Sequence, residues 1–199
     1  MTDHRPRREA TRHRLVEAAI EEFAARGIDG TSVEQLCEAA GFTRGAFYSN
    51  FSSKDDICLA IIKYQRDRVF EALTTTFGQP PADADLDWIF HDALGRFLQI
   101  IAPDENHRRT LAELRQRTNR DSAFGARAAE IGGDVNQALT QAVDELASGL
   151  GIGFRVPTPL LIATMEAVYL QEASGPDHPG AESMIGPLVR ALTVPLDQP

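Results

Sequence analysis

The sequence predicts an all-α protein with about nine helices, the first three of which form an N-terminal domain around a helix-turn-helix. Three observations support this fold class. Apolar residues recur three and four positions apart along most of the 199 residues, which is the period of amphipathic helices. Residues 31–54 read as two short helices around a tight turn. After residue 53 the pattern remains helical between loop breaks, and no segment reads as a convincing strand.

The first predicted helix covers residues 11–26. Leu15, Ala19 and Phe23 lie four positions apart and form its apolar face. Gly27 follows as a C-cap, because a helix commonly ends at a glycine in the left-handed conformation.

The second and third helices are defined by their caps. Ser32 can cap the second helix in a capping box with Gln35 three residues later. Gly41 comes after the last apolar residue of this helix, where a left-handed backbone favours glycine. Thr43 is the next N-cap, so the third helix begins directly after it.

The third helix presents a polar face with nothing apolar to bury. Phe47, with Phe51 four residues later, points to the core, whereas Arg44 can donate two hydrogen bonds to a guanine in the major groove. Gly45 permits close approach of the backbone to DNA. Uncharged side chains that donate hydrogen bonds, and the free backbone N–H groups at helix starts, can bind the phosphate oxygens of DNA. The predicted DNA-binding residues are Thr43, Arg44, Gly45, Tyr48, Asn50, Lys54 and Ser32.

The distribution of charge fits a DNA-binding domain at the N-terminus. The net charge is -9, but residues 1–63 hold nine Lys/Arg and ten Asp/Glu, so most of the acidic excess lies beyond them. Residues 1–14 alone carry five arginines and two acidic residues. This segment is either a disordered polar terminus or a loose basic arm, and a loose arm that orders on DNA would strengthen binding without reading sequence.

Residues 11–62 resemble the N-terminal domain of the TetR family of transcriptional regulators. The matching stretches are residues 18–27, 31–33, 39–41, 45–48 and 51–57. The resemblance implies an all-helical homodimer that binds a double-stranded DNA operator. It also implies a repressor that a ligand in the C-terminal domain releases, by changing the separation of the two DNA-binding domains.

Six further helices are expected downstream, at residues 54–77, 83–102, 106–118, 121–150, 158–173 and 181–193. Gly132 and Gly133 should weaken or kink the long fourth of these, because glycine in a helix interior costs about 1 kcal/mol relative to alanine. Pro187 should kink or restart the last. We expect two domains, with DNA binding in residues 1–53 and effector binding and dimerisation in residues 54–199.

The C-terminal domain offers candidates for both of its expected roles. Apolar density predicts dimerisation through residues 160–170 and 184–192. Aromatic and soft side chains at helical spacing suggest a pocket for a small hydrophobic or aromatic effector, although such residues are more often core. The candidate ligand-binding residues are Trp88, Phe97, His91, Phe124, Met165 and Tyr169.

Several other functions find no support in the sequence. No apolar run is long enough for a transmembrane helix, no secretory signal is evident, and Cys37 and Cys58 fall in apolar helical patterns, so a cytoplasmic protein is expected. The histidines lack metal-ligand spacing, and we expect neither metal nor cofactor. The alternatives left open are an all-α enzyme and a protein-binding adaptor whose helical hairpin does not read DNA.

Overall fold

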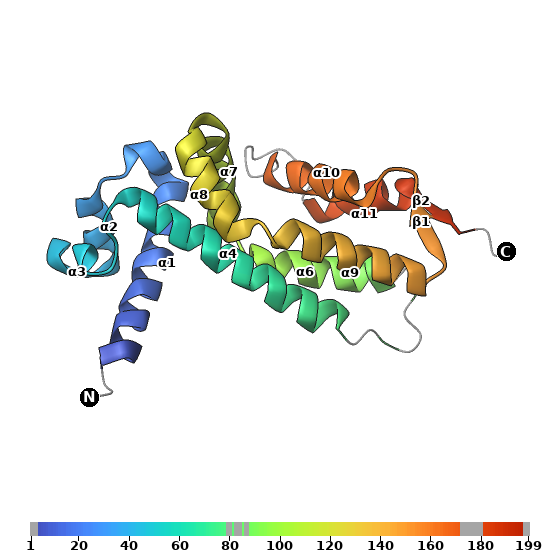
Figure 1. The fold of residues 1–199 in the computed structure, drawn as a ribbon, viewed down its shortest axis with the longest axis horizontal. Helices are drawn as coiled ribbons and strands as arrows, with labels where there is room; N and C mark the ends of the chain where they lie inside the picture. The colour runs from blue at the N-terminus through green and yellow to red at the C-terminus, as the bar shows by residue number, and fades with distance from the viewer. Residues whose placement is uncertain (1–3, 79–80, 82–84, 86–87, 172–180, 197–199) are drawn as a thin grey trace. The chain divides into compact units, whose positions relative to one another are not determined.

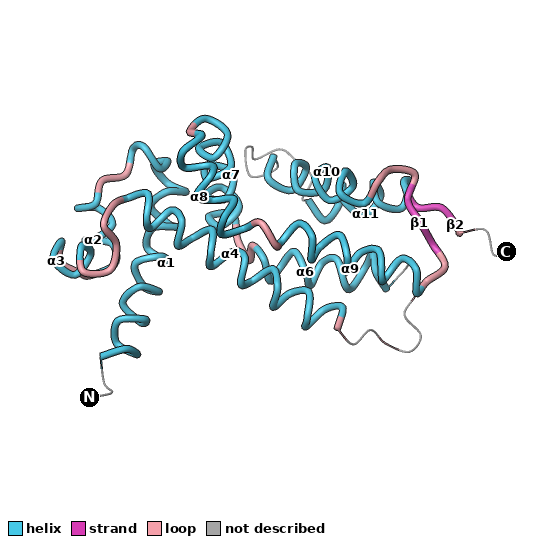
Figure 2. The backbone as a smooth tube through the Cα atoms, in the orientation of Figure 1, coloured by secondary structure: helices cyan, strands magenta, loops and turns pink. Residues whose placement is uncertain are grey.

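Helices make up nearly all of the computed structural model, which describes residues 4–78, 81, 85, 88–171 and 181–196 (Figures 1 and 2). A π-helical turn, η1 (Ile89–Ala93), leads into α6. The all-α class is confirmed, with ten α-helices in the described residues where about nine were expected. In chain order they are α1 (His4–Gly30), α2 (Val33–Ala40), α3 (Arg44–Tyr48), α4 (Lys54–Phe77), α6 (Leu94–Ile101), α7 (Glu105–Arg120), α8 (Ser122–Gly132), α9 (Val135–Gly149), α10 (Thr158–Gln171) and α11 (Ala181–Leu192).

The additional helix comes from the segment expected to be one helix over residues 121–150. It is divided into α8, which ends at Gly132, and α9, which begins at Val135. The two glycines predicted to weaken the helix therefore mark its division. By contrast, α11 extends through Pro187 without being divided. The expected start of one helix at residue 83 and the expected end of another at residue 173 lie outside the described residues.

One two-stranded antiparallel sheet corrects the prediction that the chain after residue 53 contains no strand. β1 (Ile152–Phe154) pairs with β2 (Thr193–Pro195), with Gly153 opposite Val194. Gly151 has a φ of 66°, a left-handed turn that redirects the chain between α9 and β1. Three-residue strands are too short to show the alternation by which strands are recognised in a sequence.

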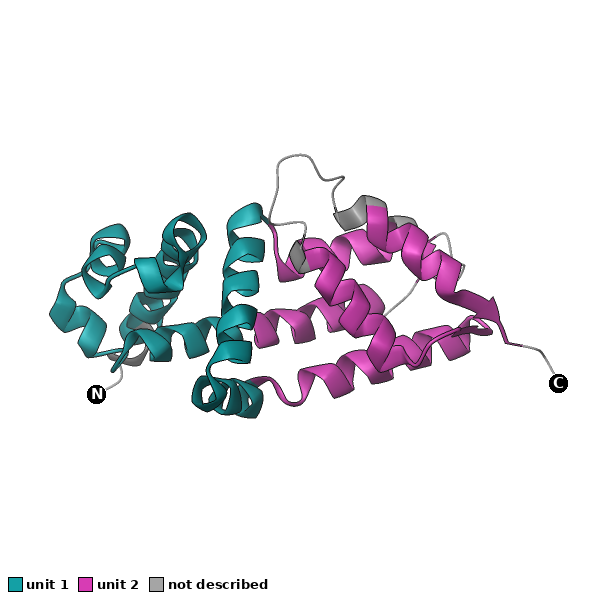
Figure 3. Cartoon of the chain, turned by 90° about the horizontal axis from the view of Figure 1, so that it is seen from above, with its two compact units in different colours: residues 1–64, 104–131 teal, residues 65–103, 132–199 magenta. Residues whose placement is uncertain are grey.

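The chain divides into two compact units, coloured separately in Figure 3. Unit 1 comprises Met1–Tyr64 and Asp104–Ile131, and unit 2 comprises Gln65–Pro103 and Gly132–Pro199. The predicted domain boundary between residues 53 and 54 therefore falls inside unit 1. Division of function between residues 1–53 and 54–199 stays a prediction.

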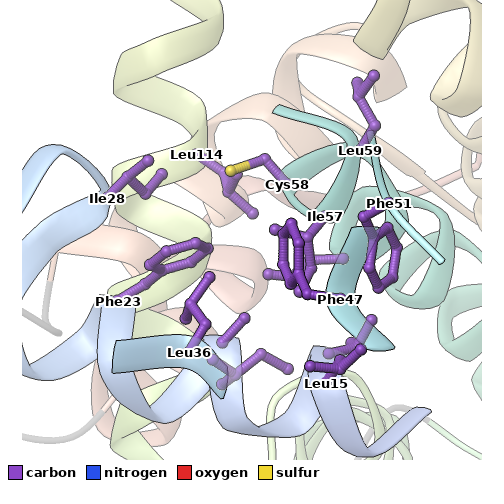
Figure 4. Packing of buried hydrophobic residues seen from close by; sticks show 14 of the residues in the cluster. Leu15, Phe23, Ile28, Leu36, Phe47, Phe51, Ile57, Cys58, Leu59 and Leu114 are labelled. Carbon is purple, nitrogen blue, oxygen red and sulfur yellow. The ribbon is translucent and has the colours of Figure 1, made fainter. Parts of the chain in front are cut away.

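The core of unit 1 joins the first four helices to α7 and α8. The predicted apolar face of α1, Leu15, Ala19 and Phe23, is fully buried. Around it lie Leu36 of α2, Phe47 of α3, Ile57 of α4 and Leu114 of α7, as Figure 4 shows. Cys37 and Cys58 are buried in the same cluster as free thiols, and burial raises the pKa of Cys58 to about 12.

Unit 2 holds the remaining helices and the sheet. Within it α10 packs against both α9 and α11, and α9 also contacts β1. Tyr169 of α10 is buried, and its hydroxyl donates to the Ala102 carbonyl at 3.0 Å. Arg68 of α4 donates to the Ile100 carbonyl at the end of α6. These contacts satisfy polar groups inside a mostly apolar helical packing.

Candidate nucleic-acid interface

The turn between α2 and α3 has the geometry that its caps predict. Ser32 and Gln35 form a reciprocal capping box, in which the Gln35 side chain accepts from the Ser32 amide at 2.8 Å. Gly41 has a φ of 69°, and the amide that follows it, of Phe42, donates to the Cys37 carbonyl at 2.8 Å. Because Gly41 adopts the left-handed conformation without steric cost, the chain leaves α2 in the direction that α3 requires.

Helix α3 exposes the polar face predicted to read DNA. Thr43 caps it by accepting from the Ala46 amide at 3.2 Å. Phe47 is the one buried residue of the helix, and its ring packs against Phe51 at a centroid distance of 5.7 Å. Four of the predicted DNA-binding residues are exposed together on this face or at its start: Thr43, Arg44, Gly45 and Tyr48.

Arg44 is held by an acidic residue that the sequence analysis did not single out. Its Nη1 lies 2.5 Å from Oε1 of Glu34 on α2, and its guanidinium lies 5.8 Å from the centre of the Tyr48 ring. Hydrogen bonding to Tyr48 and then the charge of Glu34 raise the pKa of Arg44. A hydrogen bond from its own backbone, and then Arg44, lower the pKa of Glu34. The two side chains therefore form a charged pair on an exposed surface.

Asn50 and Lys54 make internal contacts. The Asn50 amide donates to the Ala46 carbonyl at 2.8 Å, and its Oδ1 is buried without a hydrogen-bond partner in the described structure. Lys54 donates to the carbonyls of Ile28 at 2.6 Å and Thr31 at 3.1 Å. These bonds use two of its three ammonium hydrogens. Contacts with DNA stay predictions for these two residues and Ser32, as they do for the four exposed residues of α3 and its cap.

The basic N-terminal segment is helical from His4 onward, so the predicted loose arm is corrected. α1 begins at His4, eleven residues before Leu15, the first residue of its apolar face, and the helical break falls at Gly27, which has a φ of 74°. Three arginines of this segment donate to backbone carbonyls. Arg14 binds the last carbonyl of α2, and Arg8 and Arg12 bind carbonyls just after α3. The composition of this segment does not reveal which carbonyls its arginines bind.

The described candidate ligand-binding residues lie in different surroundings, and binding of an effector by them stays a prediction. Phe124 is buried in the core of unit 1, where the Arg117 guanidinium lies 5.2 Å from its ring centre. In unit 2, Phe97 packs against Phe77 at 5.9 Å, and Trp88 and Met165 are half-buried. Tyr169 is bonded to Ala102 as described above, and the side chain of His91 lies outside the described residues.

An open cavity of about 510 Å³ does occur in unit 2, between α4 and α6. It is lined by residues that the sequence analysis did not select: Thr75, Thr76, Gly95, Arg96, Gln99 and Ile100. Its hydroxyl, guanidinium and amide groups could anchor a polar end of a ligand, while Ile100 supplies apolar surface. Small residues and threonines at a helix surface give no signal of such a cavity in sequence.

In the described residues, no three His, Cys, Asp or Glu side chains are grouped in a way that could hold a metal ion. Within the same ranges, every helix is too short or too polar to cross a membrane.

The sequence similarity to a known protein family lies in the N-terminal part of unit 1. Residues 15–61 match the family model described as bacterial regulatory proteins, tetR family. The chain is 39% identical over 54 residues to the HTH-type transcriptional regulator SrpR of Pseudomonas putida, a match that covers 27% of this chain and 25% of SrpR. It is 31% identical over 97 residues to the HTH-type transcriptional activator FasR of Mycolicibacterium smegmatis, over 44% of each protein. The chain thus spans a quarter to less than half of these curated relatives.

The likeness in fold extends over nearly the whole chain. A solved structure of a putative TetR-family transcriptional regulator from Mesorhizobium loti superposes with a TM-score of 0.70 at 17% identity, covering 93% of this chain and 96% of that one. The helix-turn-helix, the match over residues 15–61 and the shared fold agree. Residues 15–61 of this chain are therefore similar to the TetR family of regulators, and the chain shares the fold of a solved structure described as a TetR-family regulator.

Proposed function

We propose that this chain is a dimeric, sequence-specific DNA-binding transcriptional regulator, in which α3 enters the major groove. The observation that carries the proposal is the exposed face of α3. Arg44 and Tyr48 are exposed there, next to the N-terminal end of the helix that Thr43 caps. Arginine is the residue best suited to read guanine. An all-α enzyme does not fit the family, because TetR-family regulators are not enzymes.

The proposal includes repression and release by a small hydrophobic or aromatic effector. An effector that binds better to the state with separated DNA-binding domains would lower operator affinity by its differential binding to the two states. The open cavity between α4 and α6 supports an effector site in this part of the chain. A cytoplasmic location follows from this role. Effector titrations that leave operator affinity unchanged, for a compound shown to bind, would contradict the mechanism.

Dimerisation is supported by two large apolar side chains that lie in the segments predicted to form the dimer. Leu160 of α10 and Met184 of α11 are exposed, and α10 and α11 pack against each other in unit 2. A two-fold symmetric dimer would place two copies of α3 on one duplex, which requires an operator with inverted symmetry.

The test is a fluorescence-anisotropy titration with duplexes from the DNA that flanks the protein's own gene, against a scrambled duplex. Wild type, Arg44→Ala and Arg109→Ala are compared at about 50 mM and about 200 mM salt. Arg109 is a matched control, because its exposed side chain pairs with Glu105 on α7. We expect salt-dependent, selective binding by wild type and Arg109→Ala, and a loss of about 1–3 kcal/mol of discrimination for Arg44→Ala.

A protein-binding adaptor gives the opposite result. It would show no preference for any flanking duplex over the scrambled one, and Arg44→Ala would change nothing.

A further inference from the structure

The proposed reading helix is too short to be held in place by its own hydrogen bonds. α3 has five residues, Arg44–Tyr48, and one buried anchor, Phe47. A helix of this length is marginal without tertiary contacts. Thr43 secures its first turn through the Ala46 amide. The last-turn carbonyls of α3 already accept from groups of Ser49, Asn50 and Phe51. The next carbonyls along the chain, those of Ser49 and Asn50, are the ones that accept from another helix.

Two arginines of α1 donate to these carbonyls. Arg8 Nη2 donates to the Ser49 carbonyl at 3.1 Å, and Arg12 Nη1 donates to the Asn50 carbonyl at 2.5 Å. The Arg12 guanidinium also lies 4.3 Å from the centre of the Phe51 ring. Arg8 and Arg12 are one helical turn apart, so both side chains leave α1 on the same side.

The placement of these charges matches the chemistry of a helix end. The C-terminal end of a helix carries partial negative charge, which a nearby cation stabilises. Arg12 is half-buried, and a guanidinium stacked on an aromatic ring keeps its planar donors in one orientation. The guanidinium thus fixes both Asn50 and Phe51, the two residues through which the end of α3 continues toward α4.

We propose that Arg12, assisted by Arg8, is a positioning residue for α3. It holds the C-terminal end of the reading helix at the angle that base recognition requires, and it contributes to discrimination without contacting bases or phosphates. The proposal rests on the proposed function for its effect on DNA, but the contact with α3 can be tested in the free protein.

The competing role for Arg12 is a direct phosphate contact, and the two roles differ in measurable ways. Loss of a phosphate contact weakens binding to every duplex alike. It also makes the negative slope of log K against log salt shallower by about 0.9. Loss of a positioning residue lowers affinity for the selected duplex more than for the scrambled one. In that case the number of phosphate contacts, and so the salt slope, stays nearly constant.

The first experiment measures hydrogen–deuterium exchange of the free protein for wild type, Arg12→Gln and Arg26→Gln. Arg26 is the matched control, because it is an exposed arginine of α1 that pairs with Glu22. For Arg12→Gln we expect the exchange rate in residues 46–51 to rise by about threefold to thirtyfold, because the free energy contributed by a cation at a helix C-terminus corresponds to a change of this size. Exchange in α7 should not change. Equal exchange in residues 46–51 of all three proteins would overturn the proposal.

The second experiment repeats the anisotropy titration with the same variants over a series of salt concentrations. We expect Arg12→Gln to reduce the ratio of selected to scrambled affinity by about threefold to thirtyfold with an unchanged salt slope. Arg12→Lys should recover part of that ratio, because it restores a donor and a charge. An unchanged ratio with a smaller salt slope would overturn the proposal in favour of a phosphate contact. If wild type binds no duplex selectively, the proposed function fails, and the exchange result still decides whether Arg12 holds α3.

Discussion

Replacing Arg117 with methionine should destabilise unit 1, because this side chain ties α7 to α1 and α4. Nη1 of Arg117 lies 3.2 Å from Oδ1 of Asp29, and Nη2 lies 2.7 Å from Oδ1 of Asp55. The Arg117 side chain is 21% exposed, whereas those of Asp29 and Asp55 are 78% and 35% exposed. The pair with Asp55 is therefore better shielded from water and should contribute more.

The magnitude follows from these exposures. A charge-assisted hydrogen bond between partly buried groups contributes about 1.5–3 kcal/mol, and the pair with exposed Asp29 adds about 0–1 kcal/mol. Methionine refills much of the volume, so the lost charge contacts dominate. We expect Arg117→Met to lower the free energy of unfolding by about 2–3 kcal/mol. For a chain of this length that loss corresponds to a melting temperature lower by roughly 4–12 °C.

Urea unfolding followed by circular dichroism measures the loss, with Arg109→Met as the control. Arg109 lies on the same helix, but its pair with Glu105 is exposed on both sides, so its replacement should change stability by less than about 0.5 kcal/mol. Equal losses in the two variants, or a loss below about 0.5 kcal/mol for Arg117→Met, would refute the assignment of Arg117 as a tie between helices.

Three further predictions concern acid stability, DNA discrimination and assembly. Hydrogen bonds from Ser52 and then Arg127 lower the pKa of Asp56, so its carboxylate stabilises the fold above about pH 4. In urea titrations, the difference in unfolding free energy between wild type and Asp56→Asn should therefore shrink as pH falls from about 6 to about 3. Glu34→Gln frees Arg44 to pair with any phosphate, so anisotropy should show a ratio of selected to scrambled affinity reduced by up to about fivefold, and an unchanged ratio would show that Glu34 does not orient Arg44. Leu160→Glu places a charge in the proposed dimer contact and should give a monomer by light scattering with circular dichroism like that of wild type; a dimer of undiminished affinity would place the contact elsewhere.

Local signals in the sequence predicted most of the helix-turn-helix. Caps depend on hydrogen bonds between residues three or four positions apart, so Ser32, Gly41 and Thr43 could be assigned correctly without knowledge of the fold. The same holds for the apolar face of α1, whose members repeat at the helical period. The division between α8 and α9 was anticipated as a weak point at the two glycines, although not as a complete break.

Features that join distant parts of the chain could not be predicted in this way. The pairing of β1 with β2 brings together residues about forty positions apart, and each strand alone has too few residues to show a pattern. The arginines of α1 looked like a basic arm because composition does not reveal which carbonyls they bind. The pair between Glu34 and Arg44 depends on the angle at which α3 leaves the turn, and the cavity between α4 and α6 depends on how those helices pack.

The most direct test of the central claim, that α3 reads DNA sequence, is an unbiased selection of bound fragments from the genome that encodes the protein. Wild type and Arg44→Ala are incubated with sheared genomic DNA, and the retained fragments are sequenced. The account predicts that wild type enriches one motif with inverted symmetry and that Arg44→Ala loses or relaxes it. Retention of fragments without a shared motif, equal for the two proteins, would contradict the claim.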